Sequence, residues 1–406
     1  MSGPLSHLRV LDLSRIMAGP WSTQIFADLG ADVIKIERPR VGDDTRSWGP
    51  PWLKDAIGKE TRESGYYLSV NRGKRSLTVA LDQPEGQAVI RELARRSDIV
   101  IENFKVDTLA RYGLDYAGLK AINPRIIYCS ITGFGQTGPK REVAAYDFAM
   151  QGMGGLMSVT GEADGIAGGG PQKVGLPIVD LTTGMYATIA VLAALAHREV
   201  SGKGDYIDVA MLDVSAAMLS NQAMNYLTTG RAPQRNGNRH PNIQPQDVVQ
   251  CRDGAMVLAV GNDAQFVKLC EALGDAELAK DLRFSKNAER VKHRDELLLR
   301  LGGEFAREAR AHWVPRLEAA GVPCGPINNV AEVFADEQIK HRQMQISLPH
   351  PTAGDVALLG SPMRFSAAPI THERHPPLLG EHTDEILTEL GHDAASIERL
   401  RKLGTI

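Results

Sequence analysis

The residue with the clearest capacity for chemistry is Asp180, which lies between apolar neighbours in the segment PIVDLTTG, residues 177–184. A carboxylate that is partly withdrawn from water can serve as a covalent nucleophile. Asp is also a preferred residue at the N-cap of a helix, and a long apolar stretch follows this one. Position alone favours the capping role, so a catalytic role needs support from elsewhere in the chain.

Five basic residues stand at or near the ends of predicted strands. In an open α/β sheet that edge binds ligands, and guanidinium groups suit phosphate recognition. Lysine and arginine are mostly solvated, however, so surface charge is the ordinary explanation for any single one of them. These candidate phosphate-binding residues are Arg38, Arg40, Lys74, Arg75 and Arg111.

Residues 133–138, GFGQTG, formally match the dinucleotide-binding pattern G-x-G-x-x-G. The residues that follow, PKRE, are not expected to open a helix, and the loop falls in the fifth strand unit rather than the first. Nicotinamide binding is therefore not predicted. The four cysteines lack the paired spacing of zinc sites and disulfide frameworks, so we expect free thiols and no bound metal.

Composition restricts the kind of protein. Of 406 residues, 46 are Lys or Arg and 49 are Asp or Glu, which gives a net charge of −3. This balance argues against a nucleic acid or an anionic membrane as a partner. The longest apolar stretch, residues 185–196, is too short to cross a bilayer, and residues 1–9 contain no signal core. A cytoplasmic location is expected.

Short runs rich in Val and Ile alternate with helix-period segments over the first 135 residues. This alternation predicts an α/β fold with a doubly wound, mostly parallel sheet. The predicted strands are 8–13, 32–36, 76–81, 98–102 and 125–131, and the predicted helices between them are 20–29, 84–96 and 116–122.

A long helix at about 182–197 and a strand at 206–210 are expected next. From about residue 228 the chain becomes polar and rich in Gly, Pro and Asn, as linkers are. A smaller α+β region should follow. Its predicted elements are a strand at 255–260 and helices near 264–273 and 294–307, and a polar helix is expected at 381–390.

A series of short motifs runs in order along nearly the whole chain. They are residues 17–20 (MAGP), 33–39 (VIKIERP), 71–76 (NRGKRS), 102–104 (ENF), 133–139 (GFGQTGP), 145–147 (AYD), Asp180 with Gly184, and 378–383 (LLGEHT). Together they make the chain resemble the family III CoA-transferases, the CaiB/BaiF type. Residues 42–51, 66–71 and 325–329 look most like the succinyl-CoA:glutarate (dicarboxylate) members of that family.

The resemblance implies a homodimer of two interlocked subunits. Each Rossmann-like large domain would be built from both chain ends, residues 1–225 and 331–406, with a smaller α+β domain at 226–330 between them. It also implies that coenzyme A and acyl-CoA act as substrates and not as tightly bound cofactors. The partners would be a small-molecule acyl-CoA and a carboxylic acid.

The same resemblance assigns roles to individual residues. Asp180 falls on the family's nucleophile, and the dicarboxylate-like segment 42–51 makes Arg46 a candidate to bind the distal carboxylate of the substrate. A structural salt bridge is an equal alternative for Arg46. The CoA-contacting positions of the family match Arg38, Asn103, Phe104, Arg111 and Tyr146.

Two positions depart from the family pattern. Met17 stands where formyl-CoA transferase has Gln. Residues 79–82 read VALD, with Asp82 where a lysine usually contacts the nucleotide.

The reaction implied by the resemblance is transfer of CoA from succinyl-CoA to a dicarboxylic acid through an aspartyl anhydride and an aspartyl-CoA thioester. An acyl-CoA hydrolase or racemase on the same scaffold, and a CoA-binding protein without catalysis, are the alternatives. Racemases of this superfamily use a His–Asp pair where this chain has Tyr146 and Asp147. Tyrosine, with a reference pKa of about 10, is a poor base near neutral pH.

Overall fold

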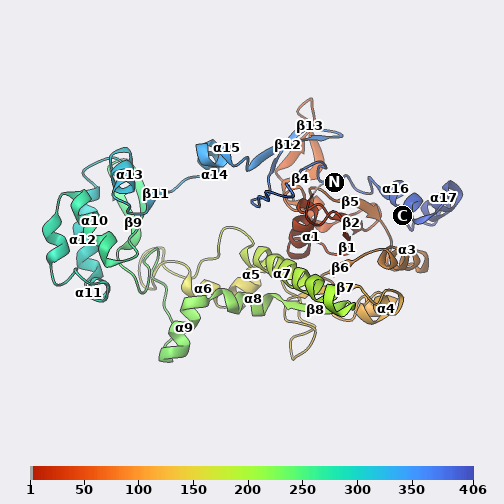
Figure 1. The fold of residues 1–406 in the computed structure, drawn as a ribbon, viewed down its shortest axis with the longest axis horizontal. Helices are drawn as coiled ribbons and strands as arrows, with labels where there is room; N and C mark the ends of the chain where they lie inside the picture. The colour runs from red at the N-terminus through yellow and green to blue at the C-terminus, as the bar shows by residue number, and fades with distance from the viewer. Residues whose placement is uncertain (1–2) are drawn as a thin grey trace. The chain divides into compact units, whose positions relative to one another are not determined.

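The computed structural model describes residues 3–406, which divide into two compact units. Unit 1 comprises residues 3–156, 174–220 and 337–406, and unit 2 comprises residues 157–173 and 221–336. Figure 1 shows the helices and strands of both units with their labels. Unit 1 therefore contains residues from near both ends of the chain.

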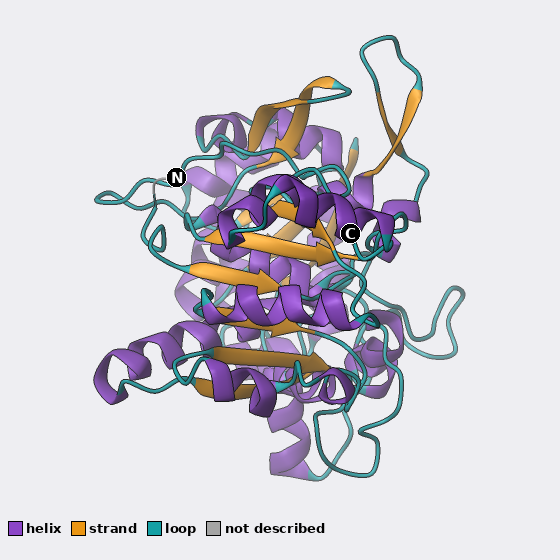
Figure 2. Ribbon diagram, turned by 90° about the vertical axis from the view of Figure 1, so that its right-hand side faces the viewer, coloured by secondary structure: helices purple, strands orange, loops and turns teal. Residues whose placement is uncertain are grey.

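The main sheet of unit 1 has six parallel strands in the order β5-β2-β1-β6-β7-β8. Figure 2 shows these strands stacked in one layer with helices on either side. The predicted parallel sheet is confirmed, and its strands are rich in the Val and Ile that suit burial on both faces. The strands are β1 (Arg9–Asp12), β2 (Asp32–Glu37), β5 (Arg75–Thr78), β6 (Ile99–Glu102), β7 (Ile127–Thr132) and β8 (Asp205–Ala210).

Successive side chains of the strands enter two separate hydrophobic cores, one on each face of the sheet. In β1, Leu11 belongs to the first core and Val10 to the second. Both faces are thus covered, as a doubly wound fold requires. The helices over the first core are α3 (Pro84–Arg95), α4 (Tyr116–Ile122), α16 (Thr383–Leu390) and α17 (Ala394–Lys402), and those over the second are α1 (Ala18–Asp28), α7 (Ile178–Ser201) and α8 (Met211–Met218).

Helix α7 begins at Ile178, earlier than the predicted start at about residue 182. By length and composition alone, it is the one helix in the described part of the chain that could cross a membrane. That criterion is weak, because the core helix of a folded domain meets it too. Here Ala187 and Val191 are fully buried in the second core, and Val179 is fully buried in a smaller cluster with Met150 and Met211, so α7 is a core helix of unit 1.

The residues of unit 1 beyond 370 attach to β5 and to the chain that follows it. The backbone N–H of His382 donates to the Ser76 carbonyl at 3.0 Å, and that of Ala80 donates to the Thr405 carbonyl at 2.7 Å. The remaining elements of unit 1 include the two antiparallel hairpins β3 (Trp52–Lys54) with β4 (Glu60–Ser64) and β12 (Gln345–His350) with β13 (Gly354–Leu359), and helices η1 (Asp44–Ser47), α2 (Gly65–Leu68), η2 (Ala110–Tyr112), α5 (Asp147–Met153) and α15 (Glu337–His341).

Unit 2 is an α+β fold around its own core, which includes Phe266, Leu301 and Trp313. Its antiparallel sheet has the order β11-β10-β9. The elements are β9 (Gln246–Cys251), β10 (Gly254–Ala259), α10 (Asp263–Leu273), η3 (Ala276–Lys280), α11 (Asn287–Lys292), α12 (Arg294–Phe305), α13 (Arg310–Ala319), β11 (Cys324–Pro326) and α14 (Val330–Ala335), while α6 (Leu156–Val159) and α9 (Ser220–Thr229) each begin in the last residue of a unit 1 segment.

The borders of the units differ from the predicted domain boundaries after residues 225 and 330. Residues 157–173, predicted to belong to the large domain, group with unit 2. The Gly237 N–H donates to the Gly161 carbonyl at 3.1 Å, which ties this segment to the chain beyond residue 230. Such a contact between distant loops leaves no local pattern in the sequence.

Candidate active site

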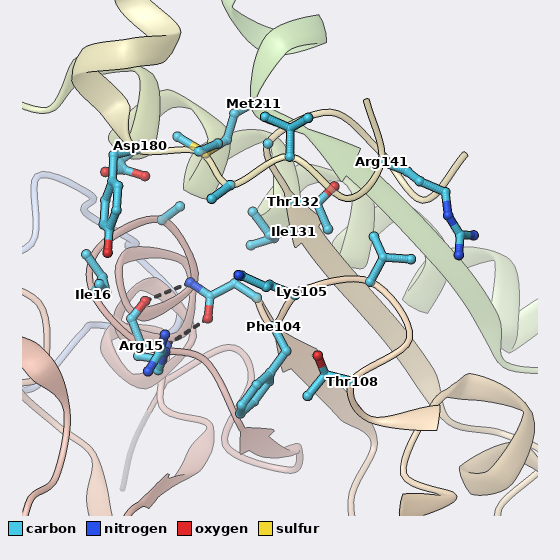
Figure 3. A pocket seen from close by; sticks show the side chains of 18 of the residues that line it. Arg15, Ile16, Phe104, Lys105, Thr108, Ile131, Thr132, Arg141, Asp180 and Met211 are labelled. Atoms are coloured by element: carbon cyan, nitrogen blue, oxygen red, sulfur yellow. Dashed lines mark hydrogen bonds between the residues drawn. The ribbon is translucent and has the colours of Figure 1, made fainter. Parts of the chain in front are cut away.

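Strand β1 lies between β2 and β6, so the chain winds outward from β1 in one direction and then returns to continue in the other. The carboxyl ends of β1 and β6 therefore form a switch point, where open α/β sheets bind ligands. A cavity of about 370 Å³ lies there (Figure 3). It is lined by residues 15–18, 103–106, 108, 131–133 and 141–146, and by Asp180 and Met211.

Asp180 is the third residue of α7 and lines this cavity, to which its side chain is partly exposed. Pro177 holds the N-cap position and provides no side-chain cap. Instead, Oδ2 of Asp147 at the start of α5 accepts the N–H of Val179 at 2.8 Å and that of Asp180 at 3.1 Å. The capping interpretation of Asp180 is therefore wrong, because Asp147 caps the helix.

The surroundings of Asp180 favour its neutral form. Burial, and then the nearby charge of Asp147, raise the pKa of Asp180 to about 7. Burial and the same two carboxylates raise the pKa of Tyr66 to about 12. A tyrosine hydroxyl that stays protonated is a hydrogen-bond donor suited to a carboxylate or an oxyanion. The contributions of Asp147 and Tyr66 were not predicted from the sequence.

Three of the predicted CoA-binding residues, Asn103, Phe104 and Tyr146, line the same cavity as Asp180. The Asn103 side chain holds the neighbouring loop, because its Oδ1 accepts the Arg15 N–H at 2.9 Å and its Nδ2 donates to the Arg15 carbonyl at 2.7 Å (Figure 3). Tyr146 is 61% exposed. The structure thus brings these three residues together with the predicted nucleophile.

Arg38 lies in a second cavity, of about 340 Å³, which shares Arg15 and Phe104 with the first. Its exposed guanidinium pairs with Asp44 at 2.9 Å. Asp82, one of the departures from the family pattern, lines this second cavity too. A carboxylate therefore stands at a position where relatives are expected to present a cation.

The other basic candidates do not line the first cavity. Arg111 is exposed in η2 and lines neither of the two cavities described above. Lys74 is buried, where it pairs with Asp12 at 3.1 Å and burial lowers its pKa to about 8. Arg75 is tied into ion pairs within unit 1, and Arg40 lies at another cavity beside the C-terminal helices.

Arg46 is a buried residue with a structural position. Its Nε and Nη2 each donate to Glu37 at 2.8 Å, and Nη1 donates to Glu63 at 3.2 Å. Nη2 also reaches the Tyr67 hydroxyl at 2.6 Å and the Pro377 carbonyl at 2.9 Å. With its donors committed in this way, Arg46 does not line the cavity, and the salt-bridge alternative describes it better than the predicted contact with substrate.

The glycine loop at 133–138 borders the cavity and is not followed by a helix before α5. A Cβ on Gly133 would lie 2.2 Å from the Ala145 Cβ, so only glycine fits there. In the part of the chain that the structure describes, no group of three or more His, Cys, Asp or Glu side chains is placed to hold a metal ion. The four cysteines are free thiols.

The sequence matches the model of CoA-transferase family III over residues 5–383. The chain belongs to this family. A succinate–glutarate CoA-transferase of Agrobacterium fabrum is 48% identical over 387 residues, which are 95% of this chain and 96% of the relative. The succinyl-CoA:glutarate CoA-transferase of Homo sapiens is 41% identical over 404 residues, which are 99% of this chain and 90% of the relative.

A crystal structure of a CAIB/BAIF family protein from Brucella suis superposes with a TM-score of 0.84 at 48% identity, covering 96% of this chain and 100% of that one. The predicted α/β architecture is therefore that of the family. As a family III CoA-transferase, the protein is an enzyme that uses CoA thioesters as substrates.

Proposed function

We propose that this family III CoA-transferase moves CoA from succinyl-CoA to a dicarboxylic acid, with Asp180 as the nucleophile. The position of Asp180 carries the proposal: it is a partly buried carboxylate in the switch-point cavity, while Asp147 does the capping of α7. The names of the Agrobacterium and human relatives, which specify succinate or succinyl-CoA and glutarate, support this substrate class.

In the proposed reaction the ionised Asp180 carboxylate attacks the thioester carbon of succinyl-CoA. A C–O bond forms and the C–S bond breaks, which gives a mixed anhydride and the CoA thiolate. The thiolate then attacks the Asp180 carbonyl of the anhydride and releases succinate, which leaves an aspartyl-CoA thioester. The acceptor carboxylate repeats both steps in the reverse sense and restores the Asp180 carboxylate. One thioester replaces another, so no further energy source is needed.

Several features of the cavity support this chemistry. Met17 and Ala18 border it where α1 begins, and no side chain caps that helix, so backbone N–H groups are available to a developing oxyanion. We assign the thioester arm to Asn103, Phe104 and Tyr146. The phosphates of CoA are assigned to the exposed guanidinium groups of Arg38 and Arg111, which suit phosphate geometry.

Product analysis tests the proposal. The enzyme is incubated with succinyl-CoA, with and without glutarate, and the CoA products are identified by mass spectrometry. Transfer predicts glutaryl-CoA only when glutarate is present. Release of free CoA without an acceptor would indicate a hydrolase. A racemase would leave succinyl-CoA unchanged and would instead epimerise an added chiral 2-methylacyl-CoA, which chiral chromatography detects. Malate, citramalate, itaconate, mesaconate and oxalate, each tried in turn, identify the acceptor.

We also propose the interlocked homodimer of the family and a cytoplasmic location. Helix α7 carries exposed apolar side chains at Met185, Ile189 and Leu192, which are 44%, 61% and 36% exposed. This spacing places them on one face of the helix. A row of large apolar residues at the surface is expected to be covered by a partner.

A further inference from the structure

Ile16, which lines the switch-point cavity, has a backbone φ of 73°. This angle lies in the left-handed region, where a β-branched residue is an outlier. This conformation is energetically unfavourable for such a residue, and it persists only where the surrounding structure imposes it. Hydrogen bonds to the neighbouring backbone explain why Ile16 adopts the left-handed conformation.

Buried side chains hold the chain from Ser14 to Ile16. Oδ1 of Asp12 accepts the Ser14 N–H at 2.9 Å and the Ser14 hydroxyl at 2.5 Å. Lys35 Nζ donates to the Ser14 carbonyl at 3.0 Å. The two carboxylate oxygens of Asp43 share the N–H of Ile16, each at 3.2 Å. Charged side chains thus hold the backbone at Ser14 and at Ile16 itself.

Lys35 and Asp43 form an ion pair at 2.9 Å, with side chains 0% and 1% exposed. Burial opposes the charge on Lys35, yet the carboxylates of Asp43, Asp12 and Glu37 raise its pKa. Burial also opposes the charge on Asp43, yet the Lys35 ammonium and hydrogen bonds from Thr45 hold its pKa well below the usual range. A buried ion pair often adds little to the stability of the folded state. We therefore consider which groups this ion pair positions.

We propose that the Lys35–Asp43 pair is a positioning device for catalysis. It fixes Ile16 in the left-handed conformation and so sets the cavity wall formed by residues 15–17. Figure 3 shows Arg15 and Ile16 on the same side of the cavity as Asp180. The inference rests on the proposed CoA transfer at Asp180. A misplacement of about 1 Å in an active site can cost about 100-fold in rate, so displacement of this wall lowers kcat.

Two substitutions of Ile16 test the conformation itself. Glycine adopts a φ of 73° readily and keeps the N–H for Asp43, whereas proline fixes φ near −65° and has no N–H. We expect kcat to fall less than about tenfold in Ile16→Gly and more than about 100-fold in Ile16→Pro, with both variants folded by circular dichroism. Equal losses would assign the effect to the missing side chain and overturn the inference.

A second experiment tests the ion pair. Asp43→Asn removes the charge and keeps the shape, and Asp28→Asn is the matched control because Asp28 forms a buried ion pair with Arg72 and does not line the cavity. We expect about a 100-fold fall in kcat for Asp43→Asn and less than about threefold for Asp28→Asn. In an Ile16→Gly background the fall in kcat caused by Asp43→Asn should be several-fold smaller, because glycine adopts the left-handed conformation without support from Asp43. An equal loss in both backgrounds contradicts the positioning role.

Trapping of the intermediate separates this inference from the proposed function. Succinyl-CoA followed by hydroxylamine should modify the peptide that contains Asp180 in the native enzyme, and should do so more slowly in Asp43→Asn. Native enzyme that shows no modification at Asp180 contradicts the proposed function. Modification at the native rate in Asp43→Asn, alongside normal modification of the native enzyme, contradicts only the positioning role.

Discussion

Asp180 and Asp147 are two carboxylates with different tasks at the start of one helix. Asp147 accepts the backbone N–H groups of Val179 and Asp180 and also bonds to the Gln151 side chain at 2.5 Å. It thereby satisfies donors that the first turn of a helix leaves open. Asp180 does not cap the helix and instead lines the cavity. Its burial and the charge of Asp147 raise the pKa of Asp180 to about 7.

The raised pKa of Asp180 predicts the pH dependence of the reaction. Only the ionised carboxylate attacks, so kcat/KM for succinyl-CoA should rise with pH through about 7. Asp147→Asn removes a charge that raises this pKa while keeping an oxygen for the helix, so the rise should move to lower pH. Asp115→Asn, at the cap of α4, should leave the profile in place. A profile that Asp147→Asn does not move, or moves to higher pH, contradicts the assignment.

Asp180→Ala should abolish transfer and leave stability almost unchanged. Loss of a true N-cap costs about 1 kcal/mol, but here Asp147 is the cap. Loss of a catalytic nucleophile lowers kcat by several orders of magnitude. Turnover and denaturant unfolding are measured for Asp180→Ala and for Asp147→Ala, and the second variant should show the larger loss of stability. A near-normal kcat in Asp180→Ala would disprove the mechanism.

Arg46→Met should destabilise unit 1 and leave acid specificity unchanged. Removal of one partner from a buried ion pair costs about 3–5 kcal/mol, because Glu37 and Glu63 would lose their cation. Urea unfolding measures this loss. Among folded molecules, the ratio of KM values for dicarboxylate and monocarboxylate acceptors should stay constant. A selective rise in the dicarboxylate KM at unchanged stability would restore the substrate-binding role of Arg46.

The residues of the site differ in how far sequence could identify them. Asp180, Asn103 and Phe104 stand in motifs that resemble those of the family, and the structure brings them to one cavity. Asp147 stands in such a motif too, but its capping of Asp180 spans 33 positions and depends on the packing of α5 near α7. The left-handed conformation of Ile16 depends on Asp43, and nothing in an Ile residue indicates it.

Elements were predicted best where the local chain determines them. Helix α4 begins and ends at the predicted residues, since Asp115 caps it from the preceding position. The strands of the main sheet lie within a few residues of their predictions. The start of α7 at Ile178 was missed because its cap comes from Asp147, which belongs to another element.

Glu102, at the end of strand β6, should make the free energy of unfolding depend on pH. Glu102 is buried there, its Oε2 accepts the Phe104 N–H at 2.8 Å, and burial raises its pKa to about 7 from an ordinary value of 4.5. The folded state therefore holds this proton more tightly than the unfolded state. Stability is lost as pH rises from about 4.5 to about 7, and it stays low at higher pH.

Glu102→Gln cannot lose a proton, so it should be more stable than the native protein at pH 8, by up to about 3 kcal/mol. At pH 5 the two proteins should differ much less. Urea unfolding at both pH values measures the difference, and Glu277→Gln, at a side chain that is 79% exposed, serves as the control. A difference of equal size at both pH values would contradict the origin in Glu102 ionisation.

For the whole molecule, the apolar face of α7 predicts assembly with a second copy. Sedimentation should give twice the mass of the chain at micromolar concentration. Ile189→Asp places a charge on the exposed face and should weaken the dimer, whereas Ile57→Asp, at a side chain 88% exposed between β3 and β4, should not. A native protein that sediments as a stable, active monomer would contradict the homodimer.

The hydrogen bonds between β5 and the last residues of unit 1 cannot form until almost the whole chain has been synthesised. Ser76 and His382 are hydrogen-bonded across 306 positions. At about 5–20 residues per second, a ribosome needs about 15–60 s to make the chain between them. Strand β5 is an edge of the parallel sheet, and an uncovered edge can pair with another chain. In the proposed interlocked homodimer, this delay would allow two unfinished subunits to link before these bonds close unit 1.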